Sequence, residues 1–275
     1  MTSLSPPSAG RPVDVSIILP RHGEDSSIIL ETLRRLKDLE ATVSTQIVLV
    51  NDGGTKADIE IARQEFPGIV VVQSRRKSGK GISIKRGLSE AVGRYVFYTD
   101  VDLPVDPAQI LDAIDILDSQ PGPAMVIGNR VRDSTPDAPS ANAYRKLTSK
   151  AYLWLFNAML QPDIRDSQCP FKLMERSLCE RIFRMSFIRG YAFDAELIHL
   201  AVISNVPVHQ MDIRWADTRA SWDLIKSAYV FVTMTINLFS IRLRWRGVGS
   251  PRPIEPPRQA TGASVQGLSE NSLNS

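Results

Sequence analysis

The sequence contains little cysteine or histidine, with two cysteines (Cys169 and Cys179) and three histidines among 275 residues. Two cysteines do not describe a disulfide framework, and neither residue type shows the spacing of a zinc site, so we expect a reducing, cytoplasmic location. Residues 1–12 have neither a basic segment nor an apolar run. We therefore expect a disordered leader there and no secretory signal peptide.

The sequence also lacks a large excess of charge of one sign and a long apolar run. The formal net charge of +3 suits anionic substrates or a membrane surface, but it is too small to indicate a nucleic-acid partner. The apolar stretch 228–241 is shorter than the roughly 20 residues that a membrane-spanning helix needs. A hydrophobic content of 43% predicts a single globular domain over 13–246, and the composition of 247–275 predicts a disordered tail.

Motifs of several common enzyme classes are missing. Lys80 lies between Gly79 and Gly81, but this loop lacks the glycine spacing and the following Ser or Thr of a Walker phosphate-binding loop. No G-x-S-x-G motif occurs, and the histidines show no metal-ligand spacing. The sequence therefore does not support a serine hydrolase, a metalloprotease or a P-loop enzyme.

Short apolar runs alternate with helical patterns through the first half of the sequence. The expected strands are 13–19, 46–50, 69–73, 95–99 and 124–128, and the expected helices are 26–39, 56–66, 82–92 and 107–117. Strands that alternate with helices of this length imply crossover connections between parallel strands. The predicted fold class is therefore α/β, a Rossmann-like, mostly parallel sheet with helices on both faces.

The second half is more irregular. We expect a mobile loop over 131–142, a compact irregular segment over 166–172, a strand over 206–213 and helices over 144–160, 176–185, 194–203 and 221–242. The last helix is amphipathic and, with the basic residues and Trp245 that follow, extends to about 246. Two interpretations stay open: it packs on the core, or it lies on an anionic bilayer surface.

Polar loops follow four of the expected strands, at 21–24, 51–54, 75–81 and 100–102. In open α/β sheets the ligand crevice lies outside the carboxyl ends of the strands, so these loops are predicted to converge on one site. The glycines allow close backbone approach, and the basic residues of 75–81 could bind phosphates or could form an ordinary solvated loop.

Asp100 and Asp102 lie directly after the strand 95–99. Residues two apart in an extended segment point the same way, so the two carboxylates can converge on one cation. Hard oxygen ligands suit Mg²⁺ or Mn²⁺, and such an ion usually completes its shell with substrate phosphate. The alternative is that an Asp-x-Asp at a strand end arises by chance.

Seven motifs in order carry a family resemblance. They are SIILP with Glu24, NDGGT, GKG, TDVDL, GNR, DSQCPFK and YAFDAEL, and they span about Val13 to Trp215. Together they resemble the family 2 inverting glycosyltransferases of GT-A fold, most closely the dolichyl-phosphate glucosyltransferase and dolichol-phosphate mannose synthase branch. His22, Gly23, Pro170 and the segment 219–222 depart from the family pattern.

The resemblance implies a role for each matched residue. The nucleotide sugar would be held by Pro20, Glu24, Asp52, Lys80, Asp100 and Val101. Asp100 and Asp102 would hold the divalent cation, Mg²⁺ or Mn²⁺, with Asp102 central to catalysis. Asp194, unless it is only a helix N-cap, would be the general base for a hydroxyl acceptor, whereas Arg130 and Arg145 would position a polyprenyl phosphate.

Three functional hypotheses follow. The leading one is a metal-dependent, inverting transfer of a hexose from a nucleotide sugar to a polyprenyl phosphate at the cytoplasmic face of a membrane. Glucose is the favoured hexose. The second keeps the donor and replaces the acceptor with a sugar or small-molecule hydroxyl. The third, from another class, is a catalytically silent protein that binds nucleotide sugars.

Overall fold

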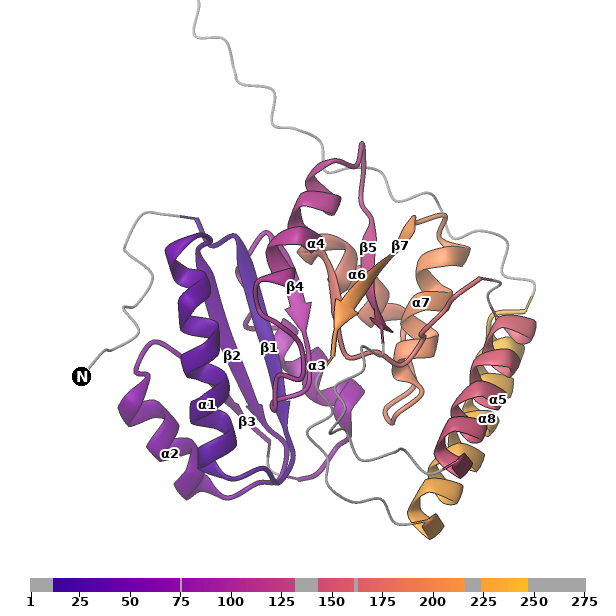
Figure 1. Cartoon of the computed structure of the whole chain (residues 1–275), viewed down its shortest axis with the longest axis horizontal. Helices are drawn as coiled ribbons and strands as arrows, with labels where there is room; N and C mark the ends of the chain where they lie inside the picture. Colours follow the sequence, from indigo (N-terminus) through magenta and orange to yellow (C-terminus); the bar gives the residue numbers. More distant parts are fainter. Residues whose placement is uncertain (1–11, 75, 132–142, 161–162, 216–223, 247–275) are drawn as a thin grey trace, which may run out of the picture.

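The computed structural model describes residues 12–74, 76–131, 143–160, 163–215 and 224–246 (Figure 1). Seven strands form one sheet in the order β3-β2-β1-β4-β6-β5-β7. The strands are β1 (Val15–Arg21), β2 (Thr45–Asn51), β3 (Val70–Gln73), β4 (Tyr95–Tyr98), β5 (Met125–Val131), β6 (Lys172–Glu175) and β7 (Val208–Arg214). The expected tail lies outside the described residues, as do the expected leader apart from Pro12 and the expected mobile loop apart from Val131. The domain limits stay a prediction.

The sheet is parallel except at one strand. β1 pairs in parallel with β2 and β4, β2 with β3, and β5 with β7, whereas β6 runs antiparallel between β4 and β5. The mostly parallel α/β prediction is confirmed, but β6 was missed and 166–172 was expected to be irregular up to Lys172. A strand of four residues is too short to show a period in the sequence.

Helices cover both faces of the sheet, as predicted (Figure 1). One face is packed by α1 (Ser26–Lys37), α2 (Lys56–Glu65) and α4 (Gln109–Asp118), and a short 3₁₀ helix, η1 (Asp38–Ala41), follows α1. The other face is packed by α3 (Lys80–Leu88), α6 (Arg176–Met185) and α7 (Phe193–Ile203). Because α3 begins at Lys80 and not at Ile82 as predicted, Lys80 lies in its first turn, beside the carboxyl ends of the strands.

Two long helices, α5 (Ala143–Met159) and α8 (Leu224–Arg244), lie side by side at one end of the molecule (Figure 1). Each contributes buried side chains to the second face of the sheet, among them Phe156 from α5 and Leu238 from α8. α8 therefore packs on the core with one side, as one of the two interpretations of this segment required. Within the described residues, no helix combines the length and the apolar character that crossing a bilayer would need.

Candidate active site

Lys80 and Asp100 meet at the carboxyl ends of the strands, as the convergence of the polar loops predicted. Lys80 Nζ lies 2.7 Å from Asp100 Oδ1, and both side chains are about one-fifth exposed. The Lys80 ammonium also lies 5.9 Å from the centroid of the Phe193 ring at the start of α7. A cation and a carboxylate thus stand together at the edge of the sheet where a diphosphate is expected. This edge, formed by the loops that follow β1, β2, β3 and β4, is called the rim below.

The Asp-x-Asp loop is held from behind by α1. Thr32 Oγ1 donates to the Val101 carbonyl at 2.6 Å, and the Arg35 guanidinium donates to the carbonyls of Leu103 and Val105 at 2.7 and 2.8 Å. Leu103 has a φ of +41°, in the left-handed region that costs energy for a branched side chain. These bonds fix the backbone that carries the two aspartates, and the sequence showed no sign of them.

Val101 and Asp102, which were both predicted as site residues, differ in exposure. Val101 is 1% exposed, so its side chain belongs to the core and any contact with a nucleotide would come from its backbone. Asp102 is half-buried. The Asp102 Oδ1 atom is buried, so only part of this carboxylate faces solvent, and its contact with a cation stays a prediction.

Asp52 shapes the basic loop that precedes α3. Its carboxylate accepts hydrogen bonds from the backbone N–H groups of Ser78 and Gly79 at 2.9 to 3.0 Å and from Ser78 Oγ at 2.6 Å. Burial alone would raise the pKa of Asp52, but the hydrogen bonds from Ser78 and Gly79 lower it overall. Asp52 is therefore an ionised anchor that places Lys80, and a direct contact with the nucleoside stays a prediction.

The glycines of the rim are required by contacts within the protein. Gly79 has a φ of +95°, and a Cβ there would lie 2.7 Å from the Arg189 carbonyl oxygen. A Cβ on Gly81 would lie 2.9 Å from Phe193 Cβ. We expected these glycines to let a ligand approach the backbone closely. At both positions the close neighbour is instead the segment 189–193 of the protein itself.

Arg21 links the first two polar loops and was not singled out from the sequence. It is 1% exposed, and its guanidinium donates to the Glu24 carbonyl at 2.7 Å, to Asn51 Oδ1 at 2.9 Å and to Asp58 Oδ2 at 2.5 Å. Pro20 lies half-buried in β1 beside Val50. A single sequence gives no signal for such a residue, because its partners come from separate elements.

Glu24 folds back on its own loop. Its Oε2 accepts hydrogen bonds from the backbone N–H groups of His22 and Gly23 at 2.7 and 3.0 Å. The His22 ring contacts the Asp52 carbonyl through Nδ1 at 2.9 Å. The loops that carry Glu24 and Asp52 are therefore connected through His22, and the nucleoside contacts of both residues stay a prediction.

Asp194 is not a helix N-cap, and it is buried. The N-cap residue of α7 is Ala192, and Asp194 is 3% exposed, 3.1 Å from Lys172 Nζ and within 3.0 Å of the Tyr98 hydroxyl, which donates to it. Burial and the negative charge of Asp194 raise the pKa of Tyr98 well above its ordinary value. A carboxylate enclosed with a buried lysine is poorly placed to take a proton from an acceptor, so the geometry disfavours the expected general-base role.

Arg130 reaches the rim but is already paired. Its Nε and Nη2 donate to the two carboxylate oxygens of Asp166 at 2.5 and 2.9 Å, and its Cζ lies 5.2 Å from the Trp215 ring centroid. Burial would raise the pKa of Asp166, but the hydrogen bonds and charge of Arg130 lower it. Arg145 lies in the first turns of α5, and its side chain is outside the described residues.

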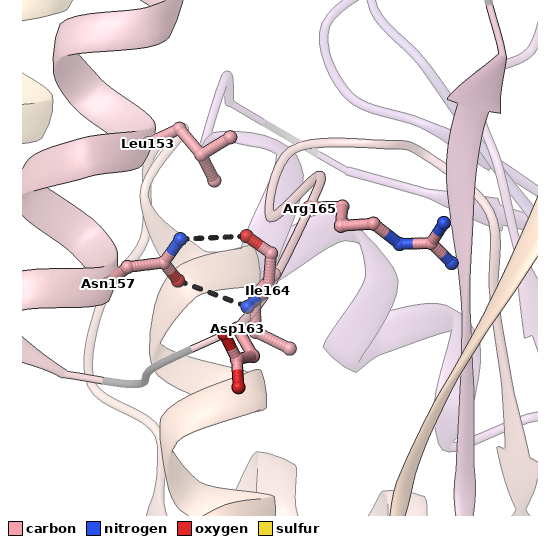
Figure 2. Close-up of a pocket in the computed structure, with 5 residues that line it drawn as sticks. All are labelled: Leu153, Asn157, Asp163, Ile164 and Arg165. Atoms are coloured by element: carbon pink, nitrogen blue, oxygen red, sulfur yellow. Dashed lines mark hydrogen bonds between the residues drawn. The ribbon is translucent and has the colours of Figure 1, made fainter.

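Two cavities border these elements. The larger, of about 770 Å³, lies between α5 and residues 163–165, where the Asn157 amide brackets the backbone of Ile164 with hydrogen bonds of 2.8 and 3.2 Å (Figure 2). The smaller, of about 510 Å³, is lined by Gln73, Ser74, Arg76 and Arg86. Arg86 Nη1 is 3.8 Å from Asp52 Oδ1, so the smaller cavity adjoins the rim.

A divalent cation at the rim would be coordinated jointly by protein carboxylates and by the phosphates of the substrate. Within the described residues, no three side chains of His, Cys, Asp or Glu gather where they could enclose a metal. Asp100 and Asp102 offer hard oxygen ligands, and Mg²⁺ is commonly bound by one or two carboxylates together with substrate phosphates. The donor set therefore suits a cation that arrives with a nucleotide diphosphate.

Glycosyltransferases of GT-A fold share a mostly parallel α/β sheet of this kind. The chain matches the model of glycosyl transferase family 2 over residues 16–184 and belongs to this family. The predicted family, fold and enzyme class are thereby confirmed.

Known relatives agree with this assignment. A dolichyl-phosphate beta-glucosyltransferase of Drosophila melanogaster is 24% identical over 252 residues, which cover 85% of this chain and 76% of that protein. One from Trichomonas vaginalis is 27% identical over 221 residues, covering 76% and 68%.

Solved structures share the fold. Glucosyl-3-phosphoglycerate synthase from Mycobacterium tuberculosis in complex with UDP superposes with a TM-score of 0.64 at 18% identity, covering 85% of this chain and 81% of that chain. Mannosyl-3-phosphoglycerate synthase from Rubrobacter xylanophilus has a TM-score of 0.64 at 21% identity, covering 88% and 77%. At such identities the likeness establishes the fold alone.

Proposed function

We propose that this enzyme transfers glucose from a nucleotide sugar to a polyprenyl phosphate, with inversion at the anomeric carbon and with the help of Mg²⁺ or Mn²⁺. The observation that carries the proposal is the Lys80 and Asp100 pair, 2.7 Å apart at the strand ends and next to Asp102. The names of the relatives support glucose and a lipid phosphate. A crystal structure of the mycobacterial synthase that contains Mn²⁺ and UDP supports the choice of cation and donor.

Different residues of the rim would bind the diphosphate and the cation. Lys80 offers positive charge to the diphosphate. The hydrogen bonds from the Gly79 N–H to Asp52 and from the Gly81 N–H to the Arg189 carbonyl hold the backbone around Lys80 in place. Asp100 and Asp102 would hold the cation, which when bound offsets the negative charge of the departing nucleotide. Thr32 and Arg35 keep these aspartates at fixed positions, so little reorganisation is needed during transfer.

A phosphate acceptor is favoured over a hydroxyl acceptor by the surroundings of Asp194. A hydroxyl needs a base to remove its proton, whereas a polyprenyl phosphate is already ionised. Asp194, the candidate base, is buried against Lys172. Arg130 uses two of its five N–H groups on Asp166, so the other three can meet an acceptor phosphate from a fixed guanidinium.

The test measures transfer of label into an organic phase. Purified protein is incubated with labelled UDP-glucose, a short-chain polyprenyl phosphate and Mn²⁺, in parallel with Asp102→Ala and with Asp112→Ala, an exposed carboxylate on α4 that serves as the matched control. We expect lipid-linked label from the wild type and Asp112→Ala and none from Asp102→Ala. Label that appears only in water-soluble products, or full activity of Asp102→Ala, would contradict the proposal.

The proposed acceptor also bears on location. A polyprenyl phosphate resides in a bilayer, so the enzyme would work at a membrane face, and the expected cytoplasmic location makes this the cytoplasmic face. The catalytically silent alternative keeps no specific support, since both aspartates of the Asp-x-Asp motif are present.

A further inference from the structure

The outer side of α8 carries a row of large apolar side chains that no other described part of the chain covers. These residues, called the apolar stripe below, are Tyr229, Val232, Ile236, Phe239 and Leu243, and they are 71%, 54%, 59%, 53% and 68% exposed. Their spacing of three and four residues places them on one face of the helix over about 21 Å.

The orientation of the stripe is fixed by the opposite face of α8. Leu238 and Ile241 are fully buried in the core, and Arg242 donates to the Met159 carbonyl of α5 at 2.8 Å. A helix held in this way can present the stripe only outward. On α5, Leu147 and Trp154 are 67% and 68% exposed and lie seven residues apart, so that helix also has an apolar outer face.

The charges on these two helices have one sign. The sequences of α5 and α8 contain six Lys or Arg residues and no Asp or Glu, although the whole chain has 30 acidic residues. Lys150, Arg242, Arg244 and Arg246 are exposed. An apolar stripe on a helix pair without acidic residues is complementary to a partner that has negative charges at its surface and an apolar interior beneath them.

A second copy of this chain fits the stripe less well. Its three-and-four spacing would suit a helix pair, but coiled coils usually flank such a seam with charges of both signs. Two copies would bring together helices that carry only positive charge, and like charges oppose association. Anionic lipid supplies the missing negative charge.

We propose that the apolar stripe of α8 docks on an anionic lipid bilayer, with the helix lying in the plane of the interface. The stripe would enter the boundary between headgroups and acyl chains, and the basic residues at the end of α8 would meet lipid phosphates. This inference extends the proposed function, since a lipid acceptor must be reached at a membrane, but it can be tested without turnover.

Vesicle binding tests the inference with a neutral double substitution. Full-length protein is sedimented with phosphatidylcholine vesicles that contain about one-third phosphatidylglycerol. Ile236→Ser with Phe239→Ser removes apolar area and leaves the charge unchanged. Ile61→Ser with Val92→Ser, at residues that are 39% and 58% exposed on other surfaces, is the matched control.

We expect the stripe variant to lose roughly tenfold or more of the partition coefficient, because each apolar side chain contributes to insertion. The control should bind like the wild type, and binding of the wild type should weaken on pure phosphatidylcholine and in high salt. Equal binding of wild type and stripe variant, or no binding by either, would overturn the proposal. So would a dimer of the wild type, seen by light scattering, that the stripe substitutions dissociate.

A parallel assay separates this inference from the proposed function. Transfer to a short-chain polyprenyl phosphate in detergent does not need a bilayer, so the stripe variant should retain it. Vesicle binding without any lipid-linked product would refute the proposed function and leave docking intact. Lipid-linked product without vesicle binding would refute docking and leave the proposed function intact.

Discussion

At the scale of single residues, the site depends on side chains whose partners lie far away in the sequence. Lys80 was singled out because it lies between two glycines, and the structure brings it to Asp100. Arg21 was not singled out, although its hydrogen bonds join the loops after β1 and β2. The difference is physical, because Lys80 belongs to a local motif and the bonds of Arg21 reach other elements of the fold.

The first prediction concerns Lys80. Lys80→Met should lower kcat/KM for transfer by about 10²- to 10³-fold, because a positive charge next to the diphosphate is lost from a preorganised site. Melting temperatures of wild type and variant, measured alongside, should agree within a few degrees. Lys85→Met, at an exposed position of the same helix, should leave kcat/KM unchanged. A Lys80→Met enzyme with normal kcat/KM would show that Lys80 does not act on the donor.

The second prediction concerns Gly54. A Cβ at this position would lie 1.9 Å from Arg21 Nη1, inside the buried network of the rim. Gly54→Ala should therefore lower the free energy of unfolding by about 2 to 3 kcal/mol, as overpacking of a tight site does. Gly122→Ala is the control, because a Cβ there has no atom within 4 Å. Urea denaturation measures both, and equal stabilities of the two variants would argue against the close contact.

The third prediction concerns pH and the Arg130 and Asp166 pair. The pKa of Asp166 is lowered in the folded state, so its carboxylate binds a proton more readily when the chain is unfolded. The pair therefore stabilises the fold above the ordinary pKa of an aspartate, and this contribution is lost as the pH falls through the lowered pKa. Asp166→Asn should flatten the loss of stability on acidification, measured by urea titrations between pH 7 and about pH 3. An unchanged pH profile would exclude this contribution.

At the scale of elements, helices hold the loops of the rim in place. α1 fixes the Asp-x-Asp loop, the loop before α7 lies against Gly79, and Phe193 at the start of α7 packs on Gly81. The buried Glu196 of α7 accepts hydrogen bonds from the backbone of Phe187 and Ile188 and from the indole of Trp245 beyond α8. The loop before α7 thus connects the rim to the helix that carries the apolar stripe.

The fourth prediction tests the role of α1. Arg35→Met removes the hydrogen bonds to the carbonyls of Leu103 and Val105 and should lower kcat/KM by roughly tenfold or more, because the loop backbone loses its anchor. Arg34→Met is the control, since Arg34 is 56% exposed in a surface ion pair with Glu65. Steady-state kinetics at saturating metal measures the effect. Equal kinetics of both variants would mean that the loop holds its shape without Arg35.

At the scale of the whole molecule, apolar packing on the two faces of the sheet forms the core. Both faces are packed by apolar side chains from helices, and the described residues contain no cluster of three metal-ligating side chains. We propose that the cation of the reaction is held by Asp100 and Asp102 together with the substrate phosphates, apart from this apolar core.

The fifth prediction follows from that division. Removal of divalent ions with EDTA should abolish glucosyl transfer and leave the melting temperature of the protein without donor unchanged. Restoring Mn²⁺ should recover activity, and it should raise the melting temperature only when UDP is also present, because the phosphates complete the coordination shell. Thermal shift measurements with each component alone and with both together check this. A large shift with Mn²⁺ alone would contradict it.

The sequence alone determined the alternation of strands and helices, the position of the polar loops at strand ends and the family. These features are local, since apolar periodicity and turn residues can be recognised within a few neighbours. The convergence of Lys80 and Asp100 could also be predicted, because parallel strands bring their carboxyl ends to one edge.

Only the tertiary structure decided what each polar residue contacts. It placed Asp194 in a buried pair with Lys172, gave Arg130 the partner Asp166 and inserted the short strand β6 between β4 and β5. It also showed which side of α8 is buried and which carries the apolar stripe. Such facts depend on contacts between distant segments, and the energy of an ion pair or an apolar face is set by burial, which no local pattern encodes.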